Sequence, residues 1–270
     1  LKDIKSLGVN RLSIGFQSFN DNILKLLGRL HKSQDCFKTF DNARKAGFDN
    51  INTDMIFNIP NLSIDNWKKD LNKLLDLNPE HISAYSLTVE PSTQLFNLVR
   101  NKKVIMPLEK TDIEQFLTTN NLLKKYNYNH YEISNYSKKN KECKHNMHYW
   151  NLSPYLSFGP SSHSYDMQKR WWNVRSLDKY IKSISESRSA IEDCETLSTK
   201  DNYNEIILNG LRLTSGVNIK NIEKFKSLYN QSKINKTIDK WDCLSIKNNN
   251  IKLTNNGFLF VDEITKELFV

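Results

Sequence analysis

The sequence is poor in cysteine and in glycine. Its four cysteines are separated by 107, 51 and 49 residues along the chain: Cys36, Cys143, Cys194 and Cys243. Because no two of them form a Cys-x-x-Cys pair, these residues alone exclude a zinc knuckle and a cysteine-ligated iron–sulfur cluster. Glycine occurs 8 times in 270 residues, which is about 3% of the chain against about 7% in an average protein.

A long hydrophobic run and a secretory leader are also missing. The longest wholly apolar runs are short, such as residues 258–261, so we expect no transmembrane segment. Cysteines scattered along the chain, with no Cys-x-x-Cys pair, suit a reducing compartment, and we therefore expect a cytoplasmic protein. The sequence starts at Leu1, directly before a helix end and a strand. We expect that the natural N-terminus is absent; removal of an initiator Met alone is the alternative.

The basic charge is spread along the chain. Lysine and arginine exceed aspartate and glutamate by 39 − 30, or +9, and 38% of the residues are hydrophobic. The densest basic run contains Lys138, Lys139, Lys141 and Lys144. A scattered surplus of this kind favours a solvated surface over a nucleic-acid-binding stripe. The length predicts one large domain, or a large domain followed by a small one.

Strands and helices alternate through residues 1–135. Short apolar runs predict strands at 11–17, 50–57, 81–88 and 130–133, and helical spacing predicts helices at 33–46, 63–78 and 111–126. This alternation is typical of an α/β fold with parallel strands. Each strand carries a polar residue in its second half or at its end: Gln17, Asp54, Thr88 and Glu132. These residues predict one site at the carboxyl ends of the strands, unless they merely mark where the strands stop.

The rest of the chain follows other patterns. Residues 136–175 lose the alternation and are rich in Asn, Ser, Tyr, Trp and His, which favours a long functional connection. Helices are then expected at 177–187, 203–213, 219–229 and 254–268. Strands at 245–247 and 250–253 flank Asn248 and Asn249, a hairpin signal. We expect a small, mainly helical C-terminal domain of winged-helix type.

Several sequence blocks, in a fixed order, carry a family resemblance. They are GVNRLSIGFQSFN (8–20), LGRLH (27–31), DMIFNIP (54–60), HISAYSLTVEP (81–91) and YEISNY (131–136). Together they resemble the radical S-adenosylmethionine (SAM) proteins related to oxygen-independent coproporphyrinogen III oxidase. The blocks His-Asn-x-x-Tyr-Trp (145–150) and Gly-Pro-x-x-His-Ser (159–164) are most similar to the haem-chaperone branch, HemW.

The resemblance implies a partial (β/α) barrel that holds SAM and a [4Fe–4S] cluster. Together with the patterns above, it predicts three parts: a barrel portion at 1–135, a connecting segment at 136–175 and a helical domain at 176–270. In the family, the Cys-x3-Cys-x2-Cys loop and the glycine-rich SAM motif lie upstream of the first block. Both are absent from these residues, so the N-terminal strands are expected to be missing and the chain alone to be inactive.

The family's SAM contacts carry over to Gln17, Arg29, Asp54 and Thr88. The guanidinium of Arg29 suits the carboxylate of SAM, although a surface ion pair is the ordinary role of an arginine. Gln17 can donate and accept hydrogen bonds. Asp54 lies among apolar residues, where a carboxylate without a partner would be costly.

The same resemblance places His145, Asn146, Tyr149 and Trp150 next to a porphyrin. Imidazole is an apt haem ligand and the aromatic rings can pack on a macrocycle, but which atom ligates iron stays open. A metal site that includes Cys143 and His148, or simple packing of the apolar side chains, are the alternatives.

Four positions depart from the family, which commonly has glycine there: Asn58, Asn61, Ser92 and Ser161. Asparagine tolerates the left-handed backbone conformation better than other non-glycine residues, and serine tolerates it less well. We therefore expect the turns at the asparagines to be kept.

The resemblance implies a role in haem or porphyrin metabolism, as a haem chaperone that binds haem and passes it to an acceptor protein, with an electron donor for the cluster. The alternative within the family is the oxidase, which decarboxylates propionate side chains of coproporphyrinogen III. A remote alternative is a nucleic-acid-binding winged helix, for which Lys233, Lys236 and Lys240 are an unremarkable basic set. A non-catalytic remnant is a further possibility.

Overall fold

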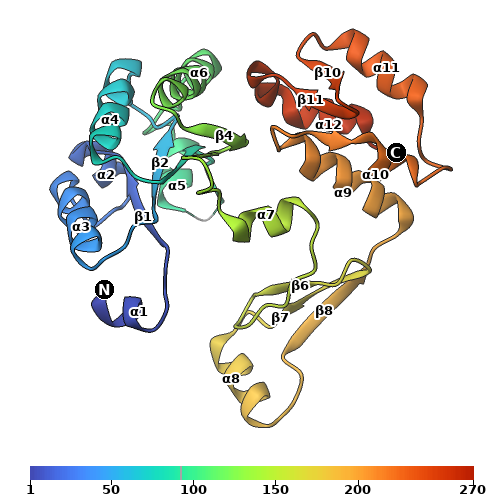
Figure 1. Ribbon diagram of the computed structural model, residues 1–270. Helices are drawn as coiled ribbons and strands as arrows, with labels where there is room; N and C mark the ends of the chain where they lie inside the picture. Colours follow the sequence, from blue (N-terminus) through green and yellow to red (C-terminus); the bar gives the residue numbers. More distant parts are fainter. Residues whose placement is uncertain (92) are drawn as a thin grey trace. The chain divides into compact units, whose positions relative to one another are not determined.

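The computed structural model describes residues 1–91 and 93–270 and divides the chain into two compact units (Figure 1). The first unit comprises Leu1–Glu142 and the second Cys143–Val270. The three-part division expected from the sequence, with boundaries after residues 135 and 175, stays a prediction. None of the helices in these described ranges is long and apolar enough to cross a membrane.

A five-stranded sheet forms the centre of the first unit. Its strands, in chain order, are β1 (Leu12–Gln17), β2 (Ile51–Phe57), β3 (His81–Ser86), β4 (Asn129–Glu132) and β5 (Asn135–Ser137). Their order in the sheet is β1-β2-β3-β5-β4, and β1, β2 and β3 are parallel. The expected α/β class with parallel strands is therefore found. The last two strands form an antiparallel hairpin, so that β5 and not β4 lies next to β3.

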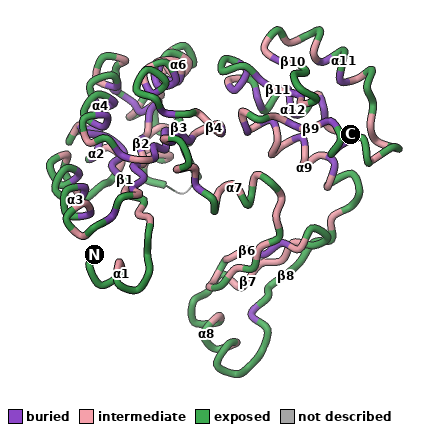
Figure 2. The backbone as a smooth tube through the Cα atoms, in the orientation of Figure 1, coloured by how far each residue is buried: buried purple, intermediate pink, exposed green. Residues whose placement is uncertain are grey.

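The helices of this unit are α1 (Lys2–Ser6), α2 (Asp21–Leu26), α3 (Ser33–Lys45), α4 (Ile64–Leu77), α5 (Gln94–Arg100) and α6 (Glu109–Lys125). The side chain of Ser63 caps α4 by accepting from the Asn66 amide, and Asn78, with φ of 54°, ends it. The face of α4 that carries Trp67 and Leu71 is buried. The buried residues in Figure 2 lie on the sheet and on the helix sides that face it.

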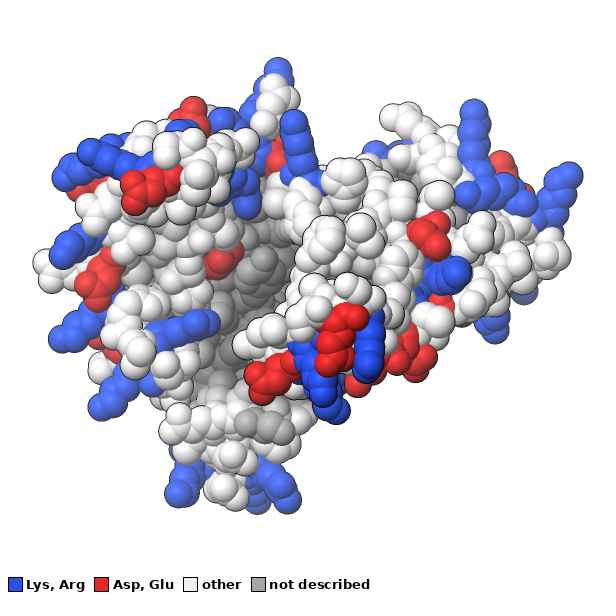
Figure 3. Space-filling view, turned by 90° about the horizontal axis from the view of Figure 1, so that it is seen from below, with Lys and Arg blue, Asp and Glu red and all other residues white. Residues whose placement is uncertain are grey.

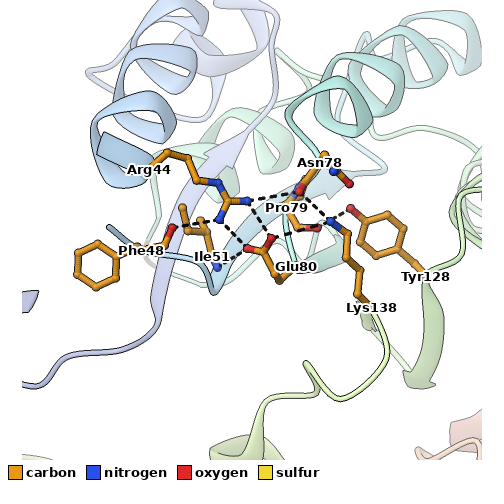
Figure 4. A network of polar contacts seen from close by, with 8 residues as sticks. All are labelled: Arg44, Phe48, Ile51, Asn78, Pro79, Glu80, Tyr128 and Lys138. Atoms are coloured by element: carbon orange, nitrogen blue, oxygen red, sulfur yellow. Dashed lines mark hydrogen bonds and ion pairs between the residues drawn. The ribbon is translucent and has the colours of Figure 1, made fainter. Parts of the chain in front are cut away.

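An ion pair ties α3 to the start of β3 (Figure 4). The Glu80 carboxylate accepts from both terminal nitrogens of Arg44, at 2.9 and 3.0 Å, and from the buried Ile51 amide at 3.0 Å. The Lys138 ammonium lies 3.9 Å from the same carboxylate. Because the three partners come from α3, β2 and the segment after β5, Glu80 fixes the amino-terminal end of the parallel strands.

The second unit begins with a helix and a separate sheet. Helix α7 (Lys144–Trp150) precedes the antiparallel strands β6 (His163–Tyr165), β7 (Lys169–Asn173) and β8 (Ile191–Thr196), and α8 (Leu177–Ser185) lies between β7 and β8 in the chain. The segment expected to be a connection, 136–175, therefore contains regular elements. All six residues of β8 are exposed, and no residue of α8 is buried, as Figure 2 shows.

The remaining elements form the helical C-terminal part that the sequence predicts. They are α9 (Thr199–Leu211), β9 (Val217–Asn218), α10 (Ile219–Glu223), α11 (Gln231–Lys240), β10 (Leu244–Lys247), β11 (Asn250–Leu253), the 3₁₀ helix η1 (Asn255–Phe260) and α12 (Val261–Leu268). The hairpin turn is as expected, with φ of 51° at Asn248 and 60° at Asn249.

Two of the expected helices differ from the structure. The helix expected at 219–229 ends at Glu223, and the chain then forms a turn in which the Leu228 amide donates to the Phe225 carbonyl. The apolar residues of this turn have a helical spacing in the sequence, which is why the pattern predicts a longer helix. The helix at 254–268 opens as the 3₁₀ helix η1, where Gly257 packs closely against Leu253.

Three of the four positions with glycine in the family have a left-handed backbone here. The φ angles are 58° at Asn58, 65° at Asn61 and 59° at Ser161. Ser92 lies outside the described residues. The turns are kept at both asparagines, as expected, and also at the serine.

Candidate functional site

The turn after β1 holds Gln17 in an unusual conformation. Gln17 has φ of 60°, and the Ser18 amide donates to the Phe16 carbonyl two residues back, which makes a three-residue turn of the rare, strained kind. The buried carboxylate of Asp70 on α4 holds this turn by accepting from the Ser18 hydroxyl at 2.6 Å and the Phe19 amide at 3.0 Å. Strained residues that are held by their surroundings are typical of functional sites.

The side chain of Gln17 is buried but not fully satisfied. It is 6% exposed, and its Oε1 atom has no hydrogen-bond partner among the described residues. The side chain folds back over Gly15, where a Cβ atom would overlap its Nε2 atom. Gly15 is therefore needed to accommodate Gln17, and a buried acceptor remains available for a ligand donor.

Asp54 belongs to a polar row across the sheet. The parallel register places Ser13, Asn52 and His81 side by side on three neighbouring strands. Asp54 and Ser83 are paired two residues further along β2 and β3. The Asp54 carboxylate accepts from the Ser13 hydroxyl at 3.1 Å and from the side-chain Nδ2 of Asn52 at 2.7 Å. The carboxylate of Asp54 therefore has hydrogen-bond donors from β1 and β2, although its neighbours in the sequence, residues 55–57, are apolar.

The row continues through a neutral histidine. Burial lowers the pKa of His81 to about 3, so the ring is neutral at physiological pH. Because Oδ1 of Asn52 is an acceptor, the His81 Nδ1–H donates to it over 2.6 Å, and Nε2 accepts from the Tyr131 hydroxyl over 2.7 Å. This chain of contacts fixes the polar face from β1 to β4.

Arg29 and Thr88 line one pocket of about 230 Å³, together with Ile56, Glu90 and Gln94. Arg29 follows α2 and is exposed, and Thr88 follows β3 and is also exposed. Gln17 and Asp54 do not line this pocket. The structure therefore brings Arg29 and Thr88 together, while Asp54 lies on the polar row and Gln17 in the turn after β1.

Glu132, one of the four polar residues that the sequence predicts at a single site, is a buried carboxyl group. It lies on the strand at the opposite edge of the sheet from Gln17, is 1% exposed, and its Oε1 atom has no partner among the described residues. Burial raises the pKa of Glu132 to about 7. The four polar strand residues therefore do not form a single cluster.

Helix α7 presents the residues of the His-Asn-x-x-Tyr-Trp block. His145 and Tyr149 lie one turn apart and are exposed, with the Tyr149 hydroxyl 3.2 Å from His145 Nε2. The Tyr149 ring also packs on Tyr155, with centroids 4.7 Å apart. Asn146 and Trp150 are half-buried. Trp150 lines a cavity of about 580 Å³ in this unit, and His145 does not.

Within residues 1–91 and 93–270, no three His, Cys, Asp or Glu side chains converge in a way that could hold a metal ion, and none of the four cysteines forms a disulfide. The alternative metal site at Cys143, His145 and His148 thus lacks a ligand cluster in the described residues. Lys and Arg side chains are distributed over the face shown in Figure 3 and are not gathered into one stripe.

Comparisons with known proteins agree over both units. The model of the Radical SAM superfamily matches residues 1–74, and that of the HemN C-terminal domain matches residues 197–260. A relative named "Heme chaperone HemW" from Bacillus subtilis is 36% identical over 232 residues, covering 86% of this chain and 60% of that protein. The protein of the same name from Haemophilus influenzae is 31% identical over 277 residues, covering 100% and 70%.

The fold has a solved counterpart. The structure of coproporphyrinogen III oxidase (HemN) from Escherichia coli matches with a TM-score of 0.80 at 19% identity, covering 100% of this chain and 66% of that one. At this identity the match shows the fold. The chain spans about three fifths of the length of the Bacillus subtilis and Lactococcus lactis relatives, at 60% and 59%.

Proposed function

Because this chain belongs to the HemW branch of the radical SAM superfamily, we propose that it is the haem-handling portion of a haem chaperone, which binds haem and passes it to an acceptor protein. The observation that carries the proposal is the similarity to proteins named haem chaperones. The match to the Haemophilus influenzae protein covers the whole chain and so includes α7. We place this activity in the cytoplasm.

Haem is the cargo in this proposal, and α7 is the element that contacts it first. The exposed imidazole of His145 can reach an iron atom without rearrangement of the core, and the exposed Tyr149 ring offers an aromatic edge beside it. Asn146 and Trp150, on the neighbouring side of the helix, complete the haem-proximal set. Tyr149 orients His145 through the contact between its hydroxyl and Nε2.

The radical SAM family uses SAM and a [4Fe–4S] cluster, and the residues of the first unit fit SAM. The buried Oε1 atom of Gln17 is an acceptor without a partner, and Arg29 lines a pocket where its guanidinium can pair with a carboxylate. We propose that Gln17, Arg29, Asp54 and Thr88 hold SAM, whose bond cleavage supplies a carbon radical when a reduced cluster is bound. Thr88 would contribute a hydroxyl at the same pocket as Arg29.

The residues described here do not fit the cluster itself. Its family ligands are three closely spaced cysteines, whereas the four thiols of this chain are far apart in sequence and form no metal-binding group in the described residues. We therefore assign no step to a cluster on these residues. We propose that its cysteines, and the contact with the electron donor, lie outside the 270 residues, and that the chain alone has no radical activity.

The second candidate is the oxidase reaction, the decarboxylation of coproporphyrinogen III. The fold shared with the oxidase from Escherichia coli favours it, whereas the relatives with 31–36% identity favour the chaperone. If a version of the protein extended by the cluster segment decarboxylates coproporphyrinogen III, the oxidase function is the correct one.

A haem titration tests the proposal. The chain should bind haem with a shift of the Soret band, and His145→Ala should weaken binding at least about tenfold, or about 1.4 kcal/mol. His163→Ala is the matched control, because His163 is an exposed histidine of the same unit that packs on Trp172; it should bind like the unaltered chain. Absence of haem binding by the unaltered chain contradicts the proposal, and equal affinities of the two variants contradict the role of His145.

A further inference from the structure

The cavity beside α7 is built from several elements of the second unit. Its volume is about 580 Å³, and its walls come from the end of α7, the β6–β7 hairpin, α9, α10 and the start of β11. This volume lies within the range of about 300–1,000 Å³ in which proteins hold small molecules and cofactors. The cavity lies entirely within one compact unit.

Aromatic rings form much of its apolar wall. Trp150, Tyr165 and Phe225 all line it, and Tyr165 is 4% exposed. Phe225 is fixed edge-on against the ring of Tyr203, with centroids 5.9 Å apart. Because the rings of Tyr165 and Phe225 are held by Tyr155 and Tyr203, this part of the wall is formed before a ligand arrives. Flat aromatic surfaces of this kind suit a planar ring system.

The charge of the lining has one sign. Lys224 is the charged residue of the described lining, which includes no Asp or Glu. Its ammonium lies 5.2 Å from the centre of the Phe225 ring, which keeps the charge beside the aromatic wall. Asn250 also lines the cavity, and its buried Oδ1 atom has no partner among the described residues. A cation without a competing carboxylate favours a ligand with carboxylate groups.

We propose that this cavity seats the porphyrin ring of the cargo, with Lys224 paired to a propionate and Phe225 packed on the macrocycle. The inference rests on the proposed function, which supplies a planar, dicarboxylate ligand. It assigns the ring to a surface that His145 does not line. The cavity accounts for the organic part of the ligand, and the haem titration of His145→Ala tests separately whether His145 ligates the iron at the centre of the ring.

Metal-free protoporphyrin IX separates the two roles, because it has the ring and the propionates but no iron to ligate. Titrated into the 270-residue chain and followed by quenching of tryptophan fluorescence, it should bind, and Lys224→Glu should weaken it at least about tenfold. Phe225→Ala should also weaken it. Lys226→Glu is the matched control, since Lys226 is exposed, two residues away and outside the cavity. It should stay within about twofold of the unaltered chain.

The outcomes distinguish the two proposals. If Lys224→Glu binds metal-free porphyrin like the unaltered chain, or if Lys226→Glu weakens it equally, the cavity assignment is wrong while haem binding by the chain still supports the proposed function. If the unaltered chain binds neither haem nor metal-free porphyrin, both proposals fail. Circular dichroism of each variant identifies a loss of fold, and Lys224→Gln, which removes the charge without reversing it, should then show an intermediate affinity.

Discussion

Replacing Glu80 by Gln should destabilise the first unit far more than the loss of a surface ion pair does. The Glu80 side chain is 13% exposed, and its carboxylate accepts from the Arg44 guanidinium through two nitrogens and from the buried Ile51 amide. Glutamine keeps one acceptor oxygen but removes the charge and turns an NH₂ group toward a cation. The Ile51 amide or one nitrogen of Arg44 then loses its partner.

The magnitude follows from these contacts. A hydrogen bond to a charged group contributes about 1.5–3 kcal/mol, and a buried group left without a partner costs about 1–3 kcal/mol. Because Arg44 is 29% exposed, water replaces part of what is lost, and we expect a decrease of about 2–3 kcal/mol in the free energy of unfolding. The control is Asp41→Asn, which breaks the pair with Lys45 at 2.6 Å, where both side chains are more than half exposed; it should cost about 0.3–0.5 kcal/mol.

Urea unfolding measures both variants, and native-state hydrogen exchange locates the effect. Faster exchange of the Ile51 amide in Glu80→Gln, with little change in the second unit, would identify the loss of this contact. Equal and small losses in Glu80→Gln and Asp41→Asn would refute the reasoning, since the half-buried pair would then behave like an exposed one.

Three further predictions concern protonation, backbone conformation and the SAM site. The pKa of Glu132 is about 7 in the folded chain against an ordinary 4.5. Its contribution to the free energy of unfolding is therefore fully present below pH 4.5 and is lost as the pH rises through 7. Between pH 4.5 and 8, the free energy of unfolding of Glu132→Gln should therefore rise by about 3 kcal/mol relative to that of the unaltered chain. Parallel pH profiles of the two proteins in urea unfolding would contradict this. Ser161→Gly should raise the free energy of unfolding by about 0.5–1 kcal/mol, because glycine adopts a φ of 59° without strain; an unchanged urea midpoint speaks against strain there. Gly15→Ala should displace the side chain of Gln17, weakening SAM binding in calorimetry while the unfolding midpoint changes little, and unchanged SAM affinity would remove Gln17 from the site.

Much of the fold follows from local patterns in the sequence. The apolar spacing and the Ser63 cap place α4 to within a residue, since a capping hydroxyl and an amphipathic face act over one or two turns. The position of β5 could not be found in this way. Three residues carry too little pattern to predict a strand, and whether β4 or β5 pairs with β3 depends on contacts across the whole sheet.

The candidate site shows the same division. Family motifs indicate Arg29 and Thr88, and the structure places both at one pocket. The partners of Asp54 could be guessed only from the register of β1 and β2, because Ser13 is 41 residues away in the chain. Lys224 and Phe225 carry no motif, and their cavity is lined by elements that lie far apart in the sequence, from Trp150 at the end of α7 to Asn250 at the start of β11.

The exposed strand β8 has a consequence for how the protein behaves in concentrated solution. A strand at the edge of a sheet offers unpaired backbone groups on which another chain can add a strand. Three of its six residues, Glu192, Asp193 and Glu195, carry carboxylates, and a second copy aligned along β8 would bring like charges together. These acidic residues therefore protect the open edge against aggregation.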